Sequence, residues 1–427
     1  MSAVKASPSQ IKGRAAAPPS KSVAHRALIC AALSGGGSVR GVIDSDDMRA
    51  TLGGLTNLGV QADQIGNTVN FKKTDRKEIH PVIDCIESGS TLRFLVPIYA
   101  ALGMECTFIG KGRLPQRPLG VYESCLPQHG VRLEYNQSEN LCLPLSLKGK
   151  LQAGKFDLPG NVSSQFITGL LFALPLCNGE SVISLTTPLE SAAYIDLTID
   201  TLRKADIVIH SVENGWIIPG GQGYSPHDFV VEGDWSQAAF LLAMGALGGE
   251  ITLTGADINS HQGDVAALDL MKRFGADITV SQSGIVCRRG ALRGIEIDAT
   301  QIPDLVPILA TVGAAAKGVT TITGASRLRL KESDRLAAIA RCLGLLGGRV
   351  KETDDGLIIE GADGFQGGAT LPGFNDHRIV MSMAAAALVC DSPVIIEDAH
   401  SVAKSWPEFF DVYRECGGEA DVIQHRE

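Results

Sequence analysis

The segment RLRLKESDR concentrates opposite charges in a way that suits anion binding. Its charged side chains are Arg327, Arg329, Lys331, Glu332, Asp334 and Arg335. Taken alone, such a segment is the start of a helix with ion pairs one turn apart, each contributing about 0.2 to 0.5 kcal/mol. The whole chain has a formal net charge of -9. An anionic ligand must therefore be held by a local cation cluster of this kind rather than by the overall field.

Other short motifs place polar residues where a helix is expected to begin. They are PSKS at 19–22, GKGRLPQRPLG at 110–120, VSSQ at 162–165, NDHR at 375–378 and AKS at 403–405. Each has an ordinary explanation as an N-cap, a turn or an exposed basic loop. Helix N-termini, however, carry unpaired N–H groups and the positive end of the helix dipole. Several of them converging on one place would form an anion site without a basic surface.

The elements that would position these residues recur at a nearly constant interval. Six segments share capping residues, a helix of small apolar residues, a polar turn and a β-rich run. They begin at residues 19, 87, 161, 233, 302 and 375, so their spacing is 68 to 74 residues. Because these helices are apolar on nearly every face, we predict that they are buried. Their first turns carry Lys21, Ser22, Arg26, Ser90, Arg93, Ser163, Ser164, Gln165, Asp304, His377 and Arg378.

Each repeat continues with an amphipathic helix and, in five of the six, with a hairpin. The sixth repeat runs out of chain, and we expect the stretch before Pro18 to supply its missing strand. The predicted fold class is α/β (α+β), with three βαβαββ units in each of two domains. The predicted domains are 15–230, and 1–14 with 231–427, with the active site in the cleft between them. A single ring of six units is the alternative.

Composition restricts the class of protein. Hydrophobic residues at 44% and charged residues at 20% are ordinary for a globular chain. The start lacks an apolar signal segment, and no stretch approaches the roughly 18 apolar residues of a membrane span. Acidic charge and few aromatics argue against nucleic-acid binding. The ten cysteines have no metal-ligand spacing, so we expect them to be reduced and buried in a cytoplasmic protein.

Taken in order, the motifs resemble those of the 5-enolpyruvylshikimate-3-phosphate synthase family, a branch of the enolpyruvyl transferases. They are PSKSxxxR, DSDD, GSTxR, RPLG, VSSQF, YID, VEGD, QGD, IPD, KESDR, NDHR and a late lysine. The resemblance implies that the enolpyruvyl group of phosphoenolpyruvate is transferred to the 5-hydroxyl of shikimate 3-phosphate, in the shikimate pathway. It also implies addition and elimination with release of phosphate, and no metal or organic cofactor. We expect two small-molecule substrates and a monomer.

The resemblance further implies which residues bind the substrates. Both substrates bring a phosphate and a carboxylate into one pocket, which requires dense contact with cations such as arginine. The residues implied for phosphoenolpyruvate are Lys21, Gly89, Arg117, Gln165, Arg335, Arg378 and Lys404. Those implied for shikimate 3-phosphate are Lys21, Ser22, Arg26, Ser163, Ser164, Gln165, Ser191, Asp304 and Lys331, with Tyr194 nearby.

The reaction needs an acid and a base, because a methylene carbon is protonated while an oxygen attacks its neighbour. By resemblance, Glu332 is the carbon acid, and Asp304 takes or orients the hydroxyl proton, alone or together with Lys21. Because these residues come from both halves of the chain, we expect domain closure to assemble the site. The chain departs from the common family pattern at Glu87, Phe94, Ala193 and Arg327, so Arg327 is left out of the site.

Two other functions share part of this pattern. The sister transferase acting on UDP-N-acetylglucosamine typically has a cysteine near the phosphoenolpyruvate arginine, and residues 108–120 contain none. A non-catalytic scaffold that binds anionic metabolites would keep the cations, but it would not need Asp304 and Glu332 beside them.

Gly89 leads to a prediction about inhibition. In this family an alanine at the matching position narrows the phosphoenolpyruvate pocket and disfavours glyphosate, which competes for the same space. We therefore expect glyphosate to inhibit the steady-state reaction. Full activity at millimolar glyphosate would contradict this expectation.

Overall fold

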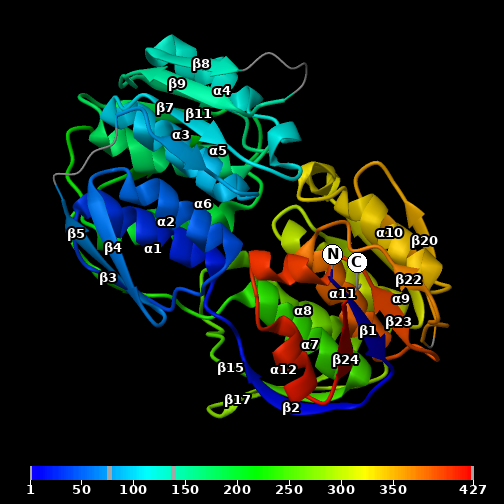
Figure 1. Ribbon diagram of the computed structural model, residues 1–427. Helices are drawn as coiled ribbons and strands as arrows, with labels where there is room; N and C mark the ends of the chain where they lie inside the picture. Colours follow the sequence, from blue (N-terminus) through cyan, green and yellow to red (C-terminus); the bar gives the residue numbers. More distant parts are fainter. Residues whose placement is uncertain (1, 75–78, 136–140, 363, 425–427) are drawn as a thin grey trace. The chain divides into compact units, whose positions relative to one another are not determined.

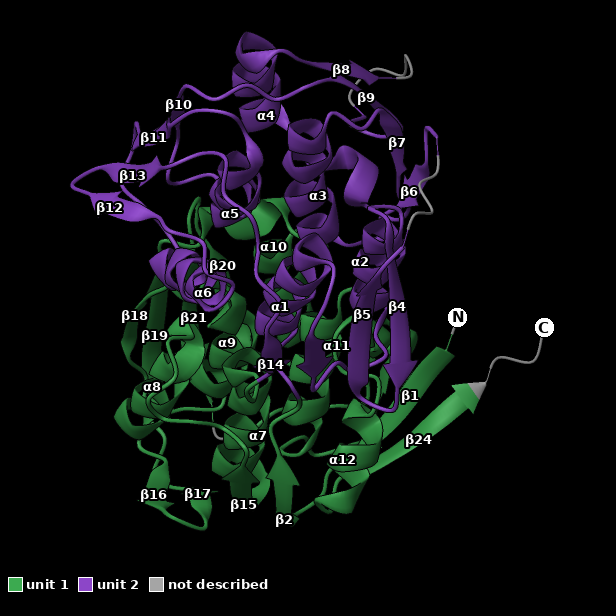
Figure 2. Ribbon diagram, turned by 90° about the vertical axis from the view of Figure 1, so that its left-hand side faces the viewer, with its two compact units in different colours: residues 1–18, 232–427 green, residues 19–231 purple. Residues whose placement is uncertain are grey.

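The computed structural model describes residues 2–74, 79–135, 141–362 and 364–424. It divides the chain into two compact units, which Figure 2 shows in different colours. Unit 1 contains Met1–Pro18 and Glu232–Glu427, and unit 2 contains Pro19–Val231. Each unit has its own hydrophobic core.

Three four-stranded sheets with a common strand order form unit 2. In each sheet a parallel pair is followed by two strands that add antiparallel. In spatial order the strands are β6 (Val82–Asp84), β7 (Cys106–Ile109), β9 (Leu145–Gly149) and β8 (Val131–Tyr135); β10 (Lys155–Leu158), β11 (Ser181–Leu185), β13 (Gly215–Ile218) and β12 (His210–Val212); and β14 (Asp228–Val230), β3 (Ser38–Arg40), β5 (Thr68–Lys73) and β4 (Val60–Ile65).

Unit 1 repeats the same order in three further sheets. The strands are β2 (Ile11–Ala16), β15 (Gly249–Thr254), β17 (Gly284–Arg288) and β16 (Asp277–Ser281); β18 (Glu296–Asp298), β19 (Gly318–Thr323), β21 (Leu357–Gly361) and β20 (Arg349–Glu352); and β22 (Thr370–Leu371), β23 (Val394–Ile396), β1 (Ser2–Ser7) and β24 (Glu419–Gln424). The predicted βαβαββ plan is confirmed.

The N-terminal stretch completes the last sheet, as the sequence predicts. β1 lies between β23 and β24 and pairs antiparallel with both. The next strand, β2, pairs parallel with β15, so the first sixteen residues serve two different sheets. Unit 2 shows the same closure, because β14 from its end pairs parallel with β3 near its beginning. Strands that are distant in sequence therefore tie each unit together.

One buried helix follows the first strand of each sheet. In unit 1 these helices pack against one another, and every residue of α7 from Trp235 to Leu247 is buried. Figure 1 shows α7, α9 and α11 within unit 1. Burial on all faces explains why the sequence of these helices has no polar side. The buried helices are α1 (Lys21–Ser34), α3 (Gly89–Leu102), α5 (Ser164–Ala173), α7 (Trp235–Gly248), α9 (Val306–Ala314) and α11 (His377–Ala387).

A second set of helices buries only one face, as their amphipathic sequences predict. They are α2 (Asp46–Thr56), α4 (Gly120–Cys125), α6 (Ala192–Lys204), α8 (Ala266–Phe274), α10 (Arg335–Leu345) and α12 (Phe409–Glu415). Short 3-10 segments precede several helices and carry motif residues. They include η4 (Gly263–Val265), η5 (Pro303–Leu305), η6 (Ser326–Leu330) and η7 (Ala399–Lys404).

Side chains cap five of the six buried helices at their N-termini. The capping residues are Ser20, Ser88, Ser163, Asp234 and Asp376, and each accepts a hydrogen bond from a backbone N–H of the first turn. The sixth helix, α9, follows η5 and has no side-chain cap. The motif residues therefore lie at the polar ends of apolar helices, where orphan N–H groups need partners.

All ten cysteines are buried and none forms a disulfide. Within the described ranges, no helix combines the length and the apolar character that crossing a membrane requires.

The central position of β1 leads to a stability prediction. Val4 is 1% exposed, and its neighbour Lys5 on the same strand is exposed. We expect Val4→Asn to lower the free energy of unfolding by about 2 to 4 kcal/mol, because it buries an amide and removes core packing. Lys5→Asn, the matched control, should change it by about 0.5 kcal/mol or less. Equal midpoints for the two variants in urea unfolding would show that β1 is dispensable.

Candidate functional site

The guanidinium of Arg335 is the centre of an ion-pair network in unit 1. Its side chain is 2% exposed. Nε and Nη2 donate to the two oxygens of Asp376 at 2.8 and 3.3 Å. Nη1 donates to Asp304 Oδ1 at 2.9 Å, and Nη2 donates to Glu332 Oε2 at 2.8 Å. One buried fork of N–H donors therefore holds three carboxylates, which suits the planar geometry of arginine.

Three helix starts bring these groups together. Arg335 is the first residue of α10, and Glu332 lies three residues before it. Asp376 is the N-cap of α11, and Asp304 lies in η5, directly before α9. Segments that are far apart in sequence thus supply one cluster, and the predicted neighbours Asp304, Glu332 and Arg335 are in contact.

Three cations surround Asp304. Besides Arg335, Arg378 places Nη2 3.3 Å from Asp304 Oδ2 and donates Nη1 to the Asp304 carbonyl at 3.1 Å. Lys331 Nζ lies 3.6 Å from Oδ1. Burial alone would raise the pKa of Asp304, but the charges of Arg378, Lys331 and Arg335 hold that pKa well below its usual range. Asp304 is therefore a carboxylate near neutral pH, able to accept a proton and unable to donate one.

The pairing of Asp376 with Arg335 shifts the pKa of both groups. Burial would raise the pKa of Asp376, but the charge of Arg335 and its hydrogen bond keep that pKa below the ordinary value. Burial would lower the pKa of Arg335, and the three carboxylates raise it instead. Ser333 Oγ also donates to Asp376 at 2.9 Å. The charged forms of both partners are therefore stable without solvent.

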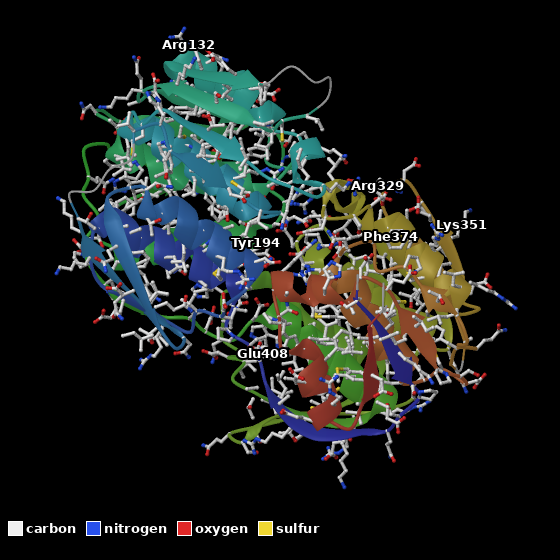
Figure 3. All side chains as sticks on the ribbon, viewed as in Figure 1. Arg132, Tyr194, Arg329, Lys351, Phe374 and Glu408 are labelled. Atoms are coloured by element: carbon white, nitrogen blue, oxygen red, sulfur yellow. The ribbon has the colours of Figure 1, made fainter. Side chains whose placement is uncertain are left out.

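Lys404 is held against a strained loop. Its Nζ donates to the carbonyl of Asn375 at 2.5 Å, and the lysine is 5% exposed. Phe374, which Figure 3 labels, and Asn375 have φ values of 53° and 50°. Asp398 stabilises this bend, because its Oδ2 accepts from the N–H of Asn375 at 3.0 Å. Such conformations cost about 1 to 3 kcal/mol each and cluster at functional sites.

In unit 2, Lys21 is paired with an aspartate of the DSDD motif. Lys21 is the first residue of α1, and its Nζ lies 2.8 Å from Oδ2 of Asp47 on α2. The two side chains are 16% and 11% exposed. This nearly buried pair holds the ammonium group at the start of the helix.

Arg26 is buried one turn further along α1 and is held by three hydrogen bonds. Nε donates to Thr198 Oγ1 at 2.9 Å, Nη1 to the Ser22 carbonyl at 2.7 Å, and Nη2 to the Tyr194 carbonyl at 2.9 Å. Its guanidinium carbon lies 5.5 and 5.8 Å from the ring centroids of Phe94 and Tyr194. Figure 3 labels Tyr194 in unit 2. Burial lowers the pKa of Arg26 to about 10, so it remains a cation.

Gln165 connects the starts of α3 and α5. Its Oε1 accepts from Arg93 Nη1 at 2.8 Å, and its Nε2 donates to Ser90 Oγ at 2.9 Å. Ser163 caps α5, and Ser164 is its buried first residue. These three residues of the VSSQ motif therefore lie at one helix start.

Arg117 lies against Gly89. Its side chain is buried, at 6% exposure, and no hydrogen-bond partner for Nε is found among the described residues. A methyl group added to Gly89 would lie 2.6 Å from Arg117 Nη1, inside the contact distance. A buried guanidinium with an unsatisfied donor is costly unless an anion pairs with it.

Ser191 has a strained backbone at the N-cap of α6. Its φ is 56°, a left-handed conformation that is uncommon for serine, and the residue is 2% exposed. Tyr194, whose carbonyl holds Arg26, follows in the first turn of the same helix.

The structure thus places every predicted residue in one of two groups. In unit 1, Asp304, Lys331, Glu332, Arg335 and Arg378 form one network, and Lys404 binds the residue next to Asp376. In unit 2, the predicted residues lie at the starts of α1, α3, α5 and α6 and in the loop that carries Arg117.

The predicted site leaves out three polar residues that hold these groups and one buried acid near Asp304. Asp376 binds Arg335, Asp47 binds Lys21, and Arg93 binds Gln165. Asp264 on η4 binds Ser236 Oγ, and burial, followed by the charge of nearby Asp304, raises the pKa of Asp264 to about 7. All four lie in the quoted motifs NDHR, DSDD, GSTxR and QGD. Their presence in these motifs was the available signal that the four residues matter. Which residues they contact depends on the fold.

Comparisons with known proteins agree over the whole chain. The family model described as EPSP synthase (3-phosphoshikimate 1-carboxyvinyltransferase) matches residues 5–413. The 3-phosphoshikimate 1-carboxyvinyltransferases of Clostridium novyi and Clostridium kluyveri are each 44% identical to this chain, and each match covers 99% of both proteins.

Solved structures show the same fold. EPSP synthase from Acinetobacter baumannii has a TM-score of 0.82 at 27% identity, covering 99% of this chain and 100% of that chain. The enolpyruvyl transferase NikO from Streptomyces tendae has a TM-score of 0.81 at 16% identity, covering 100% and 99%. The second likeness concerns the fold alone.

The Asp376–Arg335 pair predicts a large and pH-dependent effect. We expect Asp376→Asn, which keeps a capping oxygen, to lower the free energy of unfolding at pH 7 by about 3 to 5 kcal/mol, because it leaves a buried cation short of a partner. The folded pKa of Asp376 lies below its ordinary value, so the pair stabilises the fold above the ordinary pKa. This contribution is lost as the pH falls through the folded pKa.

The control for this experiment is Asp411→Asn, which removes an exposed ion pair with Arg414. It should change the free energy of unfolding by about 1 kcal/mol or less. Urea unfolding of both variants at neutral and acid pH measures the difference. An Asp376→Asn effect as small as that of the control would show that the pair contributes nothing beyond a surface contact.

Proposed function

Because the chain belongs to the EPSP synthase family, we propose that the charged helix starts of its two units form the site of enolpyruvyl transfer. The chain transfers the enolpyruvyl group of phosphoenolpyruvate to the 5-hydroxyl of shikimate 3-phosphate and releases phosphate. The observation that carries this assignment is the match of the family over the whole length of the chain.

Phosphoenolpyruvate is bound by cations from both units. Unit 1 supplies Arg335, Arg378 and Lys404, and unit 2 supplies Lys21 and Arg117. Arg117 is buried, and its Nε has no partner in the described part of the chain, which supports an anion at this position because a desolvated cation gains most from a charged acceptor. Because Gly89 has no side chain, the guanidinium of Arg117 can lie against the start of α3, and Gln165 lies at the neighbouring helix start.

Shikimate 3-phosphate is bound mainly by unit 2. Hydroxyl groups at helix starts and a buried arginine suit a phosphate, because both donate hydrogen bonds near the positive end of a helix dipole. Asp304 and Lys331 of unit 1 complete the set, with Asp304 facing the 5-hydroxyl. The unit 2 residues are Lys21, Ser22, Arg26, Ser163, Ser164, Gln165 and Ser191.

Asp304 and Glu332 divide the proton transfers of the addition step. Glu332 gives a proton to the methylene carbon, while the 5-oxygen bonds to the adjacent carbon and Asp304 accepts or orients the hydroxyl proton. Before substrates bind, the cations around Asp304 make it a weak base. Substrate anions that pair with the same cations would raise the pKa of Asp304, because they offset the positive charge. Substrate binding would thereby make Asp304 a stronger base.

Both units are needed for one complete site. The two acid-base carboxylates are in unit 1, whereas Lys21, Arg117 and Arg26 are in unit 2. Closure of the units on the substrates would therefore assemble the site, as expected for enzymes that exclude water during reaction. A monomer satisfies this requirement, since one chain supplies both units, and the free buried cysteines suit the reducing cytoplasm.

Glu332→Gln tests the assigned roles. Glutamine keeps an oxygen that can accept from Arg335, but it has no proton to give, so we expect kcat to fall by about 10²- to 10⁴-fold with similar substrate KM values. The assay follows phosphate release from phosphoenolpyruvate and shikimate 3-phosphate.

Glu360→Gln is the control, because Glu360 pairs with Arg349 on the exposed face of β21. It should leave kcat unchanged. Wild-type protein that releases no phosphate with shikimate 3-phosphate, but does so with UDP-N-acetylglucosamine, would refute the function. Full turnover by Glu332→Gln would refute only the role of Glu332.

A further inference from the structure

A chain of buried hydrogen bonds joins three helices of unit 2. His25 Nδ1 on α1 lies 2.8 Å from Thr51 Oγ1 on α2, and that oxygen lies 2.7 Å from Thr91 Oγ1 on α3. Thr91 Oγ1 donates to Ser88 Oγ, the cap of α3, at 2.8 Å. All four residues are at most 1% exposed. Helix α2 packs against both α1 and α3 (Figure 1, Figure 2), and none of the four residues has a role in the proposed transfer.

The hydroxyl protons available along this series of hydrogen bonds assign the tautomer of His25. A threonine hydroxyl has one proton, and that of Thr91 goes to Ser88. Thr51 must therefore donate its own proton to Thr91, which leaves the oxygen of Thr51 only as an acceptor towards His25. Nδ1 of His25 then carries the proton, and Nε2 carries the lone pair. Nε2 is buried and has no hydrogen-bond partner in the described part of the chain.

His25 is also expected to be uncharged. Burial, together with the nearby cations Lys21 and Arg26, lowers the pKa of His25 well below its ordinary value. A second proton on Nε2 would be buried without an acceptor, which is unfavourable. Phe94 packs against the imidazole in an edge-to-face arrangement with ring centroids 6.1 Å apart. The imidazole is thus expected to be neutral and to donate one hydrogen bond, from Nδ1 to Thr51 Oγ1.

We propose that His25 is a positioning residue for enolpyruvyl transfer. Through Thr51 and Thr91, its Nδ1–H holds the start of α1, which carries Lys21, at a fixed distance from the start of α3, where Gly89 lies against Arg117. This rests on the proposed function, in which these two helix starts bind phosphoenolpyruvate. The imidazole acts through the helices and touches neither substrate.

Breaking these hydrogen bonds should weaken the binding of phosphoenolpyruvate more than that of shikimate 3-phosphate. Lys21 and His25 are four residues apart on α1 and therefore share a face of the helix. Arg26, on the shikimate 3-phosphate side, is held independently by Thr198 and by the carbonyls of Ser22 and Tyr194. Loss of the hydrogen bonds between His25, Thr51 and Thr91 should thus displace Lys21 relative to Gly89 and leave Arg26 in place.

Nitrogen NMR of the full chain labelled with 15N-histidine tests the tautomer. The chain has nine histidines, and the spectrum of His25→Asn identifies the signals of His25 by their absence. We expect the Nδ1–H tautomer and no titration between about pH 5 and pH 8. An Nε2–H tautomer, or an imidazole that becomes protonated in this range, would overturn the proposal. This comparison decides the tautomer even if the Thr51 variants described below fail to fold.

Thr51 provides a matched pair of variants for kinetics. Thr51→Val keeps the shape and removes the hydroxyl, whereas Thr51→Ser keeps the hydroxyl. We expect Thr51→Val to lower kcat/KM for phosphoenolpyruvate by about 10- to 100-fold, because small displacements of binding groups have large effects on rate. The KM for shikimate 3-phosphate should stay within about 3-fold, and Thr51→Ser should resemble the wild type.

Thr320→Val is the control for loss of a buried hydroxyl, because Thr320 Oγ1 on β19 is buried without a partner among the described residues. It should leave the kinetics unchanged. A fall in kcat alone for Thr51→Val, with both KM values unchanged, would indicate a smaller active fraction and overturn the positioning role. Equal kinetics for Thr51→Val and Thr51→Ser would also overturn it. If the wild type shows no transfer, the proposed function fails, while the NMR result still tests the hydrogen-bond chain.

Discussion

The buried charge of Arg335 is the constraint on which the site of unit 1 depends. A guanidinium that is 2% exposed must have its donors satisfied, and three carboxylates from three helix starts satisfy them. The charge of Arg335 in turn favours the ionised forms of Asp304 and Asp376. This network places cations next to carboxylates, and we propose that an anionic substrate replaces some of these carboxylates as the partner of the cations.

The two units connect the starts of their buried helices by different kinds of interaction. Their buried helices are apolar along most of their length, so the polar groups that they carry are confined to the starts. Unit 1 links these starts by ion pairs around Arg335. Unit 2 links α1, α2 and α3 by the hydrogen bonds that run from His25 to Ser88, and Nε of Arg117 has no hydrogen-bond partner among the described residues. Fixed helix starts are preorganised, which reduces the entropy lost when substrates bind.

Much of the fold follows from local pattern, whereas the contacts of the site do not. The repeat of about seventy residues predicts the buried helices, and the strand missing from the last repeat predicts the insertion of β1. Asp376 and Asp47 look like ordinary caps and first-turn acids, because their partners Arg335 and Lys21 lie on other elements. Burial likewise lowers the pKa of His25, and burial is a property of the packed unit.

A crystal structure of the Glu332→Gln variant with both phosphoenolpyruvate and shikimate 3-phosphate would show whether the charged helix starts bind the two substrates. We predict that oxygen atoms of phosphoenolpyruvate lie within hydrogen-bond distance of Arg117 and Arg335, and that Asp304 contacts the 5-hydroxyl of shikimate 3-phosphate. Ligands bound elsewhere, with the guanidinium of Arg117 still without an anion, would contradict it.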